Sequence, residues 1–349
     1  MQDINLAASQ KRPVFSEASK QASKQASKQT SLEKMEQCGH AVLNTEVKQK
    51  DTNRAIVIAV SSRAIFDLEE EHTLFLEKGK EEFENHQRAN ENEPLKEGTA
   101  FNFIKAAQMV NEKLLEKNPQ EKLLFDVILV SNNSPQSGSR IINSAKHYGL
   151  DITRFCFVNE EDSIKYLHSN NVKLFLSADK TDVCNALKRG IPAAMVFKQE
   201  VLAPSDQLRV VFDGDAVLFS DETEHIFREK GLSEAVNYEK LRESVPIQEG
   251  PLKEFAMLLG ELRKKFSLDN SPLCIYLMTS WSNRDMSARA IRTLRVWGLE
   301  VDEAFFLDGA PKGPILSQIQ PHIFFDDGMH HIWGAQGVGT PAALVLSSC

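Results

Sequence analysis

The sequence predicts an α/β protein built from two tandem Rossmann-like units, each with a parallel sheet. Three observations support this prediction. Short uninterrupted apolar segments recur along the chain, helical patterns separate them, and the order of both is repeated in the second half. With 349 residues, the chain is long enough for two domains that each bury a core.

The apolar segments are short and continuous, which is typical of strands buried on both faces of a parallel sheet. They lie at 55–60, 125–130, 173–176, 193–197, 208–212, 273–278, 304–307, 323–325 and 342–346. Amphipathic helical patterns lie between them, at 101–115, 139–148, 252–266 and 287–297. Strands that alternate with helices in this way favour a parallel sheet covered by helices on both faces.

The second half of the chain repeats the first at a nearly constant spacing. The matching segments are 56–60 with 208–212, 140–142 with 289–291, 174–176 with 323–325, and 190–194 with 339–343. An ordered series of matches along both halves is not expected by chance. We therefore predict a first unit at residues 51–205 and a second at 206–349, the second with an insertion at about 220–272.

Residues 1–50 are predicted to be a disordered tail. The tetrapeptide Ala-Ser-Lys-Gln occurs three times between Ala18 and Gln29, and little in this stretch is apolar. Such a segment cannot bury enough apolar surface to offset the entropy lost on ordering.

Composition excludes several classes of protein. A net charge of −8 and a pI near 5.7 argue against a protein that coats nucleic acid. No apolar run reaches the roughly 18–20 residues that span a bilayer, and the N-terminus has no secretory apolar core, so we expect no membrane segment. The five cysteines are scattered and never form Cys-x-x-Cys, so we expect them to be reduced and mostly buried.

Acidic residues follow two predicted strands of the second unit, Asp213-Gly214-Asp215 after one and Asp326-Asp327 after another. The carboxyl ends of strands in an open parallel sheet are where ligands bind. Magnesium takes oxygen ligands, and one or two carboxylates with a carbonyl and a substrate phosphate suffice to hold it. Asp213, Asp215, Asp326 and Asp327 are therefore the candidate metal site.

Donors for a phosphate group follow the remaining strands of that unit. Thr279 and Ser280 end one strand, and Lys312 lies in the stiff loop 309–314. Each residue alone is a weak signal, because strand-end hydroxyls often cap helices and loop lysines are usually solvated. Together with the carboxylates they make the set that phosphoryl transfer requires: a nucleophile, a cation site and donors for the phosphate oxygens.

The ordered set Asp-x-Asp, Thr/Ser, Lys and Asp-Asp resembles the four motifs of the haloacid dehalogenase (HAD) superfamily of aspartate-based phosphatases. Within it, the segments 59–64, 212–222, 309–314 and 322–327 resemble the cytosolic type I 5′-nucleotidases, and the similarity covers about residues 54–345. The resemblance implies HAD-like units and a cap made by the insertion at about 220–272. Members of that family are expected to continue slightly further than Cys349, where this chain departs from the pattern.

The resemblance also implies an activity and residue roles. The expected reaction is Mg²⁺-dependent hydrolysis of AMP and related nucleoside 5′-monophosphates in the cytoplasm, by a homo-oligomer that ADP activates. Asp213 would form an aspartyl phosphate, and Asp215 would act as acid and then base. Thr279, Ser280 and Lys312 would bind the phosphate. The alternatives are a phosphatase for another small phosphate ester and a catalytically silent nucleotide-binding regulator.

The first unit lacks this chemistry. At the matching positions, Ser61 replaces Asp213, Arg63 replaces Asp215, Ser163 replaces Lys312, and 177–178 is Ser-Ala in place of Asp-Asp. The simpler interpretation is a scaffold. The alternative is a metal-free pocket for a phosphorylated effector such as ADP, formed by Ser61, Ser62, Arg63, Ser131 and Asn132, in which Arg63 would bind phosphate in place of the cation.

Overall fold

The structure is a computed structural model that describes residues 41–132, 137–158, 163–201, 206–281, 284–347 and 349. Residues 1–40, which hold most of the predicted tail and Cys38, lie outside the described residues. Residues 41–43, within the range predicted as a tail, form a strand, and the Asn44 side-chain amide donates a hydrogen bond to the Ile152 carbonyl at 2.9 Å. Residues 42–349 form one compact unit.

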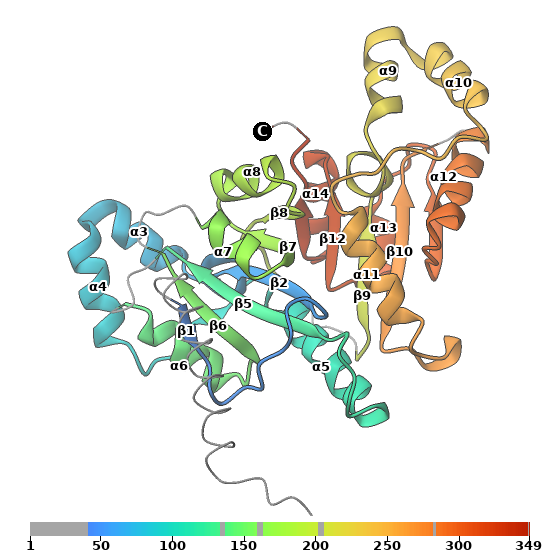
Figure 1. Ribbon diagram of the computed structural model, residues 1–349. Helices are drawn as coiled ribbons and strands as arrows, with labels where there is room; N and C mark the ends of the chain where they lie inside the picture. The colour runs from blue at the N-terminus through green and yellow to red at the C-terminus, as the bar shows by residue number, and fades with distance from the viewer. Residues whose placement is uncertain (1–40, 133–136, 159–162, 202–205, 282–283, 348) are drawn as a thin grey trace, which may run out of the picture. The chain divides into compact units, whose positions relative to one another are not determined.

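A single large sheet runs through this unit, in the order β1-β6-β5-β2-β7-β8-β13-β12-β9-β10-β11 (Figure 1). Its strands are β1 (Ala41–Leu43), β2 (Ile56–Ser61), β5 (Phe125–Ser131), β6 (Ile152–Phe157), β7 (Val172–Ser177), β8 (Ala193–Val196), β9 (Leu208–Phe212), β10 (Leu273–Thr279), β11 (Glu303–Phe306), β12 (Ile323–Asp326) and β13 (Ala342–Leu344). A separate pair is formed by β3 (Phe66–Asp67) and β4 (Lys96–Glu97).

In the sheet order from β6 at one side to β11 at the other, each strand runs parallel to its neighbours. The one exception among these described strands is the pair β8 and β13, which is antiparallel. The central strands β2 and β9 consist mainly of buried aliphatic residues, as strands covered on both faces require. The prediction of an α/β fold with a mostly parallel sheet is confirmed. The segments predicted as strands all contribute to this one sheet.

Helices connect the strands. They are α2 (Ser62–Ile65), α3 (Glu69–Lys78), α4 (Lys80–Ala89), α5 (Phe101–Lys117), α6 (Ser139–His147), α7 (Ile164–Ser169), α8 (Lys180–Lys188), α9 (Glu222–Lys230), α10 (Leu232–Leu241), α11 (Lys253–Arg263), α12 (Arg284–Trp297), α13 (Gly313–Ile319) and α14 (Met329–Gln336), with short turns η1 (Gly214–Leu218) and η2 (Leu268–Asn270). In α5, Phe103, Ala107, Val110 and Leu114 recur at helical spacing and are buried, which places one face of the helix in the core.

The strand order is the same on the two sides of the β8–β13 junction. One side has the order β6-β5-β2-β7-β8 and the other β11-β10-β9-β12-β13. When the strands of each side are counted along the chain, both orders are third, second, first, fourth and fifth. On each side a helical hairpin follows the central strand, α3–α4 after β2 and α9–α10 after β9 (Figure 1). Gly79 and Gly231 join the two helices of each hairpin with φ of 83° and 86°, a conformation that favours glycine.

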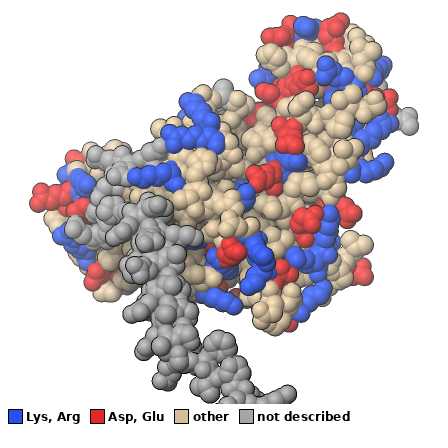
Figure 2. Space-filling model, in the orientation of Figure 1, with Lys and Arg blue, Asp and Glu red and all other residues tan. Residues whose placement is uncertain are grey.

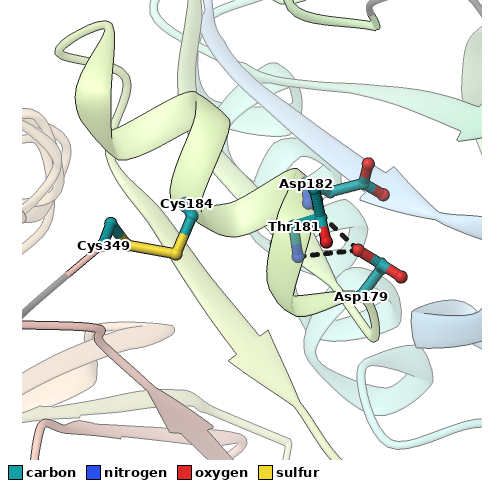
Figure 3. The surroundings of a disulfide bond; sticks show 5 residues. All are labelled: Asp179, Thr181, Asp182, Cys184 and Cys349. Carbon is teal, nitrogen blue, oxygen red and sulfur yellow. Dashed lines mark hydrogen bonds between the residues drawn. A yellow bond between two sulfur atoms is a disulfide. The ribbon is translucent and has the colours of Figure 1, made fainter.

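The interpretation of all five cysteines as unpaired was wrong for two of them. Cys184 of α8 forms a disulfide with Cys349, and their Cα atoms are 5.2 Å apart (Figure 3). The pair is 165 residues apart in sequence, so no short spacing pattern reveals it. It forms because β8, which follows α8, pairs with β13 near the C-terminus, and this brings the two segments together. Cys156 is buried, as expected.

The described surface carries charges of both signs. On the face shown in Figure 2, lysine and arginine side chains are interspersed with aspartate and glutamate. Within the part of the chain that the structure describes, no helix is both long and apolar enough to cross a membrane.

Candidate active site

Three neighbouring strands end together at one edge of the sheet. β9 lies between β10 and β12, and Phe212 at its end is paired with Leu277 on one side and Phe325 on the other. Asp213 follows β9 directly, and its backbone N–H donates to the Phe325 carbonyl at 2.8 Å. Because the strands are parallel, Asp213, Thr279 and Asp326 reach the same edge, as the ligand-binding rule for such sheets requires.

The chain turns sharply after Asp213. In the turn η1, Asp215 has extended backbone angles and Ala216 adopts a left-handed conformation with φ of 57°. A Cβ atom on Gly214 would lie only 3.1 Å from the Thr279 hydroxyl oxygen, so glycine lets the turn approach β10 closely. This conformation places two acidic side chains, Asp213 and Asp215, beside the strand ends.

Lys312 bridges two carboxylates in the centre of the site. Its ammonium group donates to Asp213 Oδ1 at 2.7 Å and to Asp326 Oδ2 at 2.6 Å, and all three side chains are buried. The lysine is held at the start of α13, where Pro314 occupies the first turn. Burial disfavours the charged lysine, but Asp213 and Asp326 together hold the pKa of Lys312 above its ordinary value.

Asp213, Asp326 and Asp327 form a cluster in which one oxygen from each lies within 4.8 Å of the others. Burial raises the pKa of Asp213 and outweighs the opposing effect of Lys312. Burial, with the negative charges of Asp213 and Asp326, raises the pKa of Asp327 to about 7. An oxygen-only donor set whose charges repel one another fits a hard divalent cation, because the ion would relieve that repulsion.

Asp215 lies in a different environment from the cluster. Burial, followed by the charge of Asp213, raises the pKa of Asp215 well above its ordinary value. The Trp281 indole N–H donates to Asp215 Oδ2, whereas the buried Oδ1 has no protein partner among the described residues. A carboxyl group of this kind can hold a proton near neutral pH and keep one oxygen available to a ligand.

Hydroxyl groups complete the edge of the site. Thr279 is buried at the end of β10, next to the turn after β9. Ser280 Oγ lies 3.3 Å from Nε2 of His331 in α14. Burial lowers the pKa of His331 to about 4, and the charge of Lys312 adds to this effect. The imidazole is therefore neutral near pH 7, and its Nε2 can donate a hydrogen bond to Ser280 or accept one from it, depending on the tautomer.

The structure thus brings to one edge the residues that the sequence singled out in the second half: Asp213, Asp215, Thr279, Ser280, Lys312, Asp326 and Asp327. Sequence reasoning did not assign Trp281 or His331 to the site. Trp281 lies two residues after Thr279 at the same strand end, and this position was the one available signal. The hydrogen bonds of both residues cross between elements far apart in sequence, which motifs do not show.

The predicted effector residues lie elsewhere, at the equivalent edge of the first half. Ser61 ends β2 and Ser131 ends β5, and the hydroxyls of Ser62 and Ser131 are 3.1 Å apart. Ser61, Ser62, Arg63 and Asn132 line a cavity there, whereas Ser131 lies directly behind it.

Fold and site together define a class: parallel-sheet α/β proteins with a lysine-bridged carboxylate cluster at the strand ends. The family model for 5′-nucleotidases matches residues 48–348. The human protein "Cytosolic 5′-nucleotidase 1B" is 48% identical over 295 residues, which cover 83% of this chain. The chain belongs to the 5′-nucleotidase family.

The match covers 48% of the human relative, so the chain spans about half the length of the curated protein it matches. No solved structure matches this chain significantly.

Proposed function

We propose that this chain is a phosphatase that hydrolyses AMP and related nucleoside 5′-monophosphates to nucleoside and phosphate, with Asp213 as the nucleophile. The observation that carries the proposal is the contact of buried Lys312 with both Asp213 and Asp326, at 2.7 and 2.6 Å, in a member of the 5′-nucleotidase family. This contact fixes a carboxylate at the end of the central strand and supplies positive charge where a phosphate would bind.

In the first step, an Asp213 carboxylate oxygen attacks phosphorus and the bond from phosphorus to the 5′-oxygen breaks. Asp215 gives its proton to that leaving oxygen, which departs as the nucleoside hydroxyl. The raised pKa of Asp215 supports this role, because the group is protonated where an ordinary aspartate is ionised. The product bound to the protein is an aspartyl phosphate.

In the second step, Asp215, now ionised, takes a proton from water. The water oxygen attacks phosphorus, and the bond from phosphorus to Asp213 breaks, which regenerates the carboxylate and releases phosphate. The hydrogen bond from Trp281 supports the ionised form of Asp215 between the two steps. Thr279 and Ser280 donate to phosphate oxygens, and Lys312 offsets their charge.

Asp213, Asp326 and Asp327, with the backbone carbonyl of Asp215, would hold Mg²⁺. The clustered oxygens and their raised pKa values support this assignment. When bound, the ion supplies positive charge that stabilises the phosphoryl group during transfer. The hydrogen bonds of Lys312 to Asp213 and Asp326 hold both carboxylates in place, so the nucleophile stays oriented.

The two halves are proposed to be tandem HAD-like units, with α9–α10 as the cap over the active site. The shared strand order and the matching hairpins support this relationship. We further propose a cytoplasmic homo-oligomer that binds neither nucleic acid nor membrane. The name of the human relative supports the location, and the mixed charges on the face shown in Figure 2 support the absence of nucleic acid.

The decisive test is phosphate release from AMP with Mg²⁺ and with EDTA. The chain should turn over AMP only with the ion, and Asp213→Asn should lower kcat to background because the amide cannot attack phosphorus. Asp308→Asn, which changes an acid in a nearby loop, is the matched control and should keep activity. Turnover by Asp213→Asn would refute the nucleophile. Activity on sugar phosphates but not on nucleotides would favour the other phosphatase, and binding without turnover would favour a silent regulator.

A further inference from the structure

The first half contains a cavity of about 560 Å³ at the carboxyl ends of β2, β5 and β7, closed on one side by the hairpin α3–α4. We propose that this cavity is a second ligand site, which binds a nucleoside phosphate without a metal ion. The proposal rests on the tandem relationship and on the nucleotide site proposed for the second half. The volume is that of a typical small-molecule pocket.

The cavity occupies the position in the first half that the active site occupies in the second. Ser61 ends the central strand β2 as Asp213 follows the central strand β9, and Ser177 ends β7 as Asp326 ends β12. The replaced carboxylates remove the cation site. Among the residues that the structure describes, Asp213, Asp326 and Asp327 are the one group of acidic, histidine or cysteine side chains close enough to hold a metal. A ligand in the first-half cavity must therefore be held by protein groups.

The hairpin α3–α4 at this cavity and the hairpin α9–α10 of the second half are each held by a buried arginine. Buried Arg140 donates to Gln87 of α4 at 3.0 Å, and buried Arg289 donates to Glu239 of α10 at 2.8 Å. Arg140 also pairs with Glu71 of α3 at 2.8 Å. The first half has thus kept an enclosing hairpin, with buried hydrogen bonds to hold it, although it has no carboxylate cluster to enclose. A scaffold alone does not require that feature.

Arg63 supplies a cationic group for the phosphate. One terminal nitrogen donates to Glu69 at 2.8 Å, whereas the buried Nε has no partner among the described residues. The side chains of Arg63 and Glu69 are 30% and 40% exposed, so their ion pair is weak and can yield to a ligand. A guanidinium has five N–H donors in a planar fork that fits phosphate oxygens, and Lys80 and His72 also line the cavity.

The acidic residues of the lining have partners within the protein, and one of them, Glu84, lies 3.8 Å from Arg88. Glu71 is paired with Arg140, and Asp179 accepts hydrogen bonds from the backbone N–H groups of Thr181 and Asp182 at the start of α8 (Figure 3). Burial, followed by the charge of Asp179, raises the pKa of Asp182, which lies 3.1 Å from the Ser177 hydroxyl. These contacts reduce the repulsion that an anionic ligand would meet.

The cavity lining also contains aromatic side chains that suit a planar ring. Phe75 and Phe83 of the hairpin lie edge to face with ring centroids 5.9 Å apart, and both line the cavity together with Leu68. Phe75 is 42% exposed, so part of its ring is not covered by the protein. Aromatic side chains, a guanidinium and several serine hydroxyls in the lining of one cavity are the groups expected to contact the base and the phosphate of a nucleotide.

The test is calorimetric titration of the full chain with the phosphonate analogues of AMP and ADP, in which CH₂ replaces the 5′-oxygen and prevents hydrolysis at the phosphorus next to the sugar. With Mg²⁺ we expect two equivalents of analogue per chain, and with EDTA one. Arg63→Gln should weaken the EDTA-resistant equivalent about tenfold or more, because a charge-assisted contact is lost. Arg54→Gln, an exposed arginine of the same half outside the cavity, is the control and should change neither equivalent.

The Mg²⁺-dependent equivalent reports the active site and shows that each variant is folded. Loss of all binding in EDTA, or an EDTA-resistant equivalent that Arg63→Gln leaves unchanged, would overturn the second site. If only the EDTA-resistant equivalent were present, the second site would stand and the proposed active site would fail. The two proposals therefore fail separately.

Discussion

Replacing Lys312 by methionine removes the ammonium group from between two buried carboxylates while keeping most of the side-chain volume. Lys312 lies 2.7 Å from Asp213 and 2.6 Å from Asp326, and its side chain is 1% exposed. At an effective dielectric constant of about 20, each contact contributes an attraction of about 6 kcal/mol, which is offset by the cost of burying the charges. Removing one partner of such a group leaves the others unpaired and costs about 3–5 kcal/mol.

We therefore expect Lys312→Met to lower the free energy of unfolding by about 3–5 kcal/mol in EDTA at mildly alkaline pH, above the pKa of about 6 of the Asp213 carboxyl group. Mg²⁺ should recover part of this loss, because an ion that binds only the folded state stabilises it. Phosphate release from AMP should fall by about 100-fold or more, since a preorganised charge near the phosphate is lost. Urea unfolding with and without Mg²⁺ measures the stability, and a phosphate assay measures turnover.

Lys146→Met is the matched control. Lys146 also pairs with a carboxylate, Glu46 at 3.0 Å, but both side chains are more than half exposed. Exposed pairs contribute about 0–1 kcal/mol, so this substitution should have little effect on stability or turnover. If Lys312→Met destabilised the protein no more than Lys146→Met, the buried lysine would not hold the carboxylates together as argued.

Three further predictions concern the proton of Asp215, the charge of Asp327 and the disulfide. Trp281→Phe removes a hydrogen bond to ionised Asp215 and should raise the pKa of Asp215, so the alkaline limb of kcat should move to higher pH; Trp333→Phe, an exposed control, should leave it in place. The folded-state pKa of Asp327, about 7, is above the ordinary value of 3.8, so this group favours folding at low pH and that contribution is lost as pH rises towards 7. The metal-free chain should therefore lose stability from about pH 4 to 7, and Asp327→Asn should flatten the slope; an unchanged slope would contradict the assignment. Peptide mapping of the unreduced protein should find Cys184 linked to Cys349. Reductant should lower the free energy of unfolding, measured with urea, by up to about 5 kcal/mol, because the unfolded chain regains the entropy that closing a loop of 165 residues removes. An alkylated Cys184 in the unreduced protein would contradict the pairing.

The local features of the fold were predictable because they depend on neighbouring residues. Continuous apolar runs identified β2 and β9, and the repeat of 56–60 at 208–212 indicated that they are matching strands of two similar halves. The carboxylates and Lys312 were found for a related reason: residues that follow parallel strands must reach one edge, whatever the loops between them do. The chemical roles of these residues stay predictions until the variants are measured.

The remaining features depend on which distant segments meet. The antiparallel pairing of β8 with β13 joins both halves in one sheet, and no local pattern specifies that edge contact. The same junction brings Cys184 to Cys349, so the disulfide was missed with it. The Trp281 indole N–H donates a hydrogen bond to Asp215 across the strand ends. This contact depends on the turn after β9, in which Ala216 has a φ of 57°.

The sequence by itself determined the alternation of strands and helices, the repeat, and the half that retains its carboxylates, because hydrophobic periodicity and residue type are properties of the chain. Only the tertiary structure decided how the halves join, which carboxylates share Lys312, and that the half without carboxylates still encloses a cavity. Those outcomes depend on packing and burial, which are set when segments far apart in sequence come into contact.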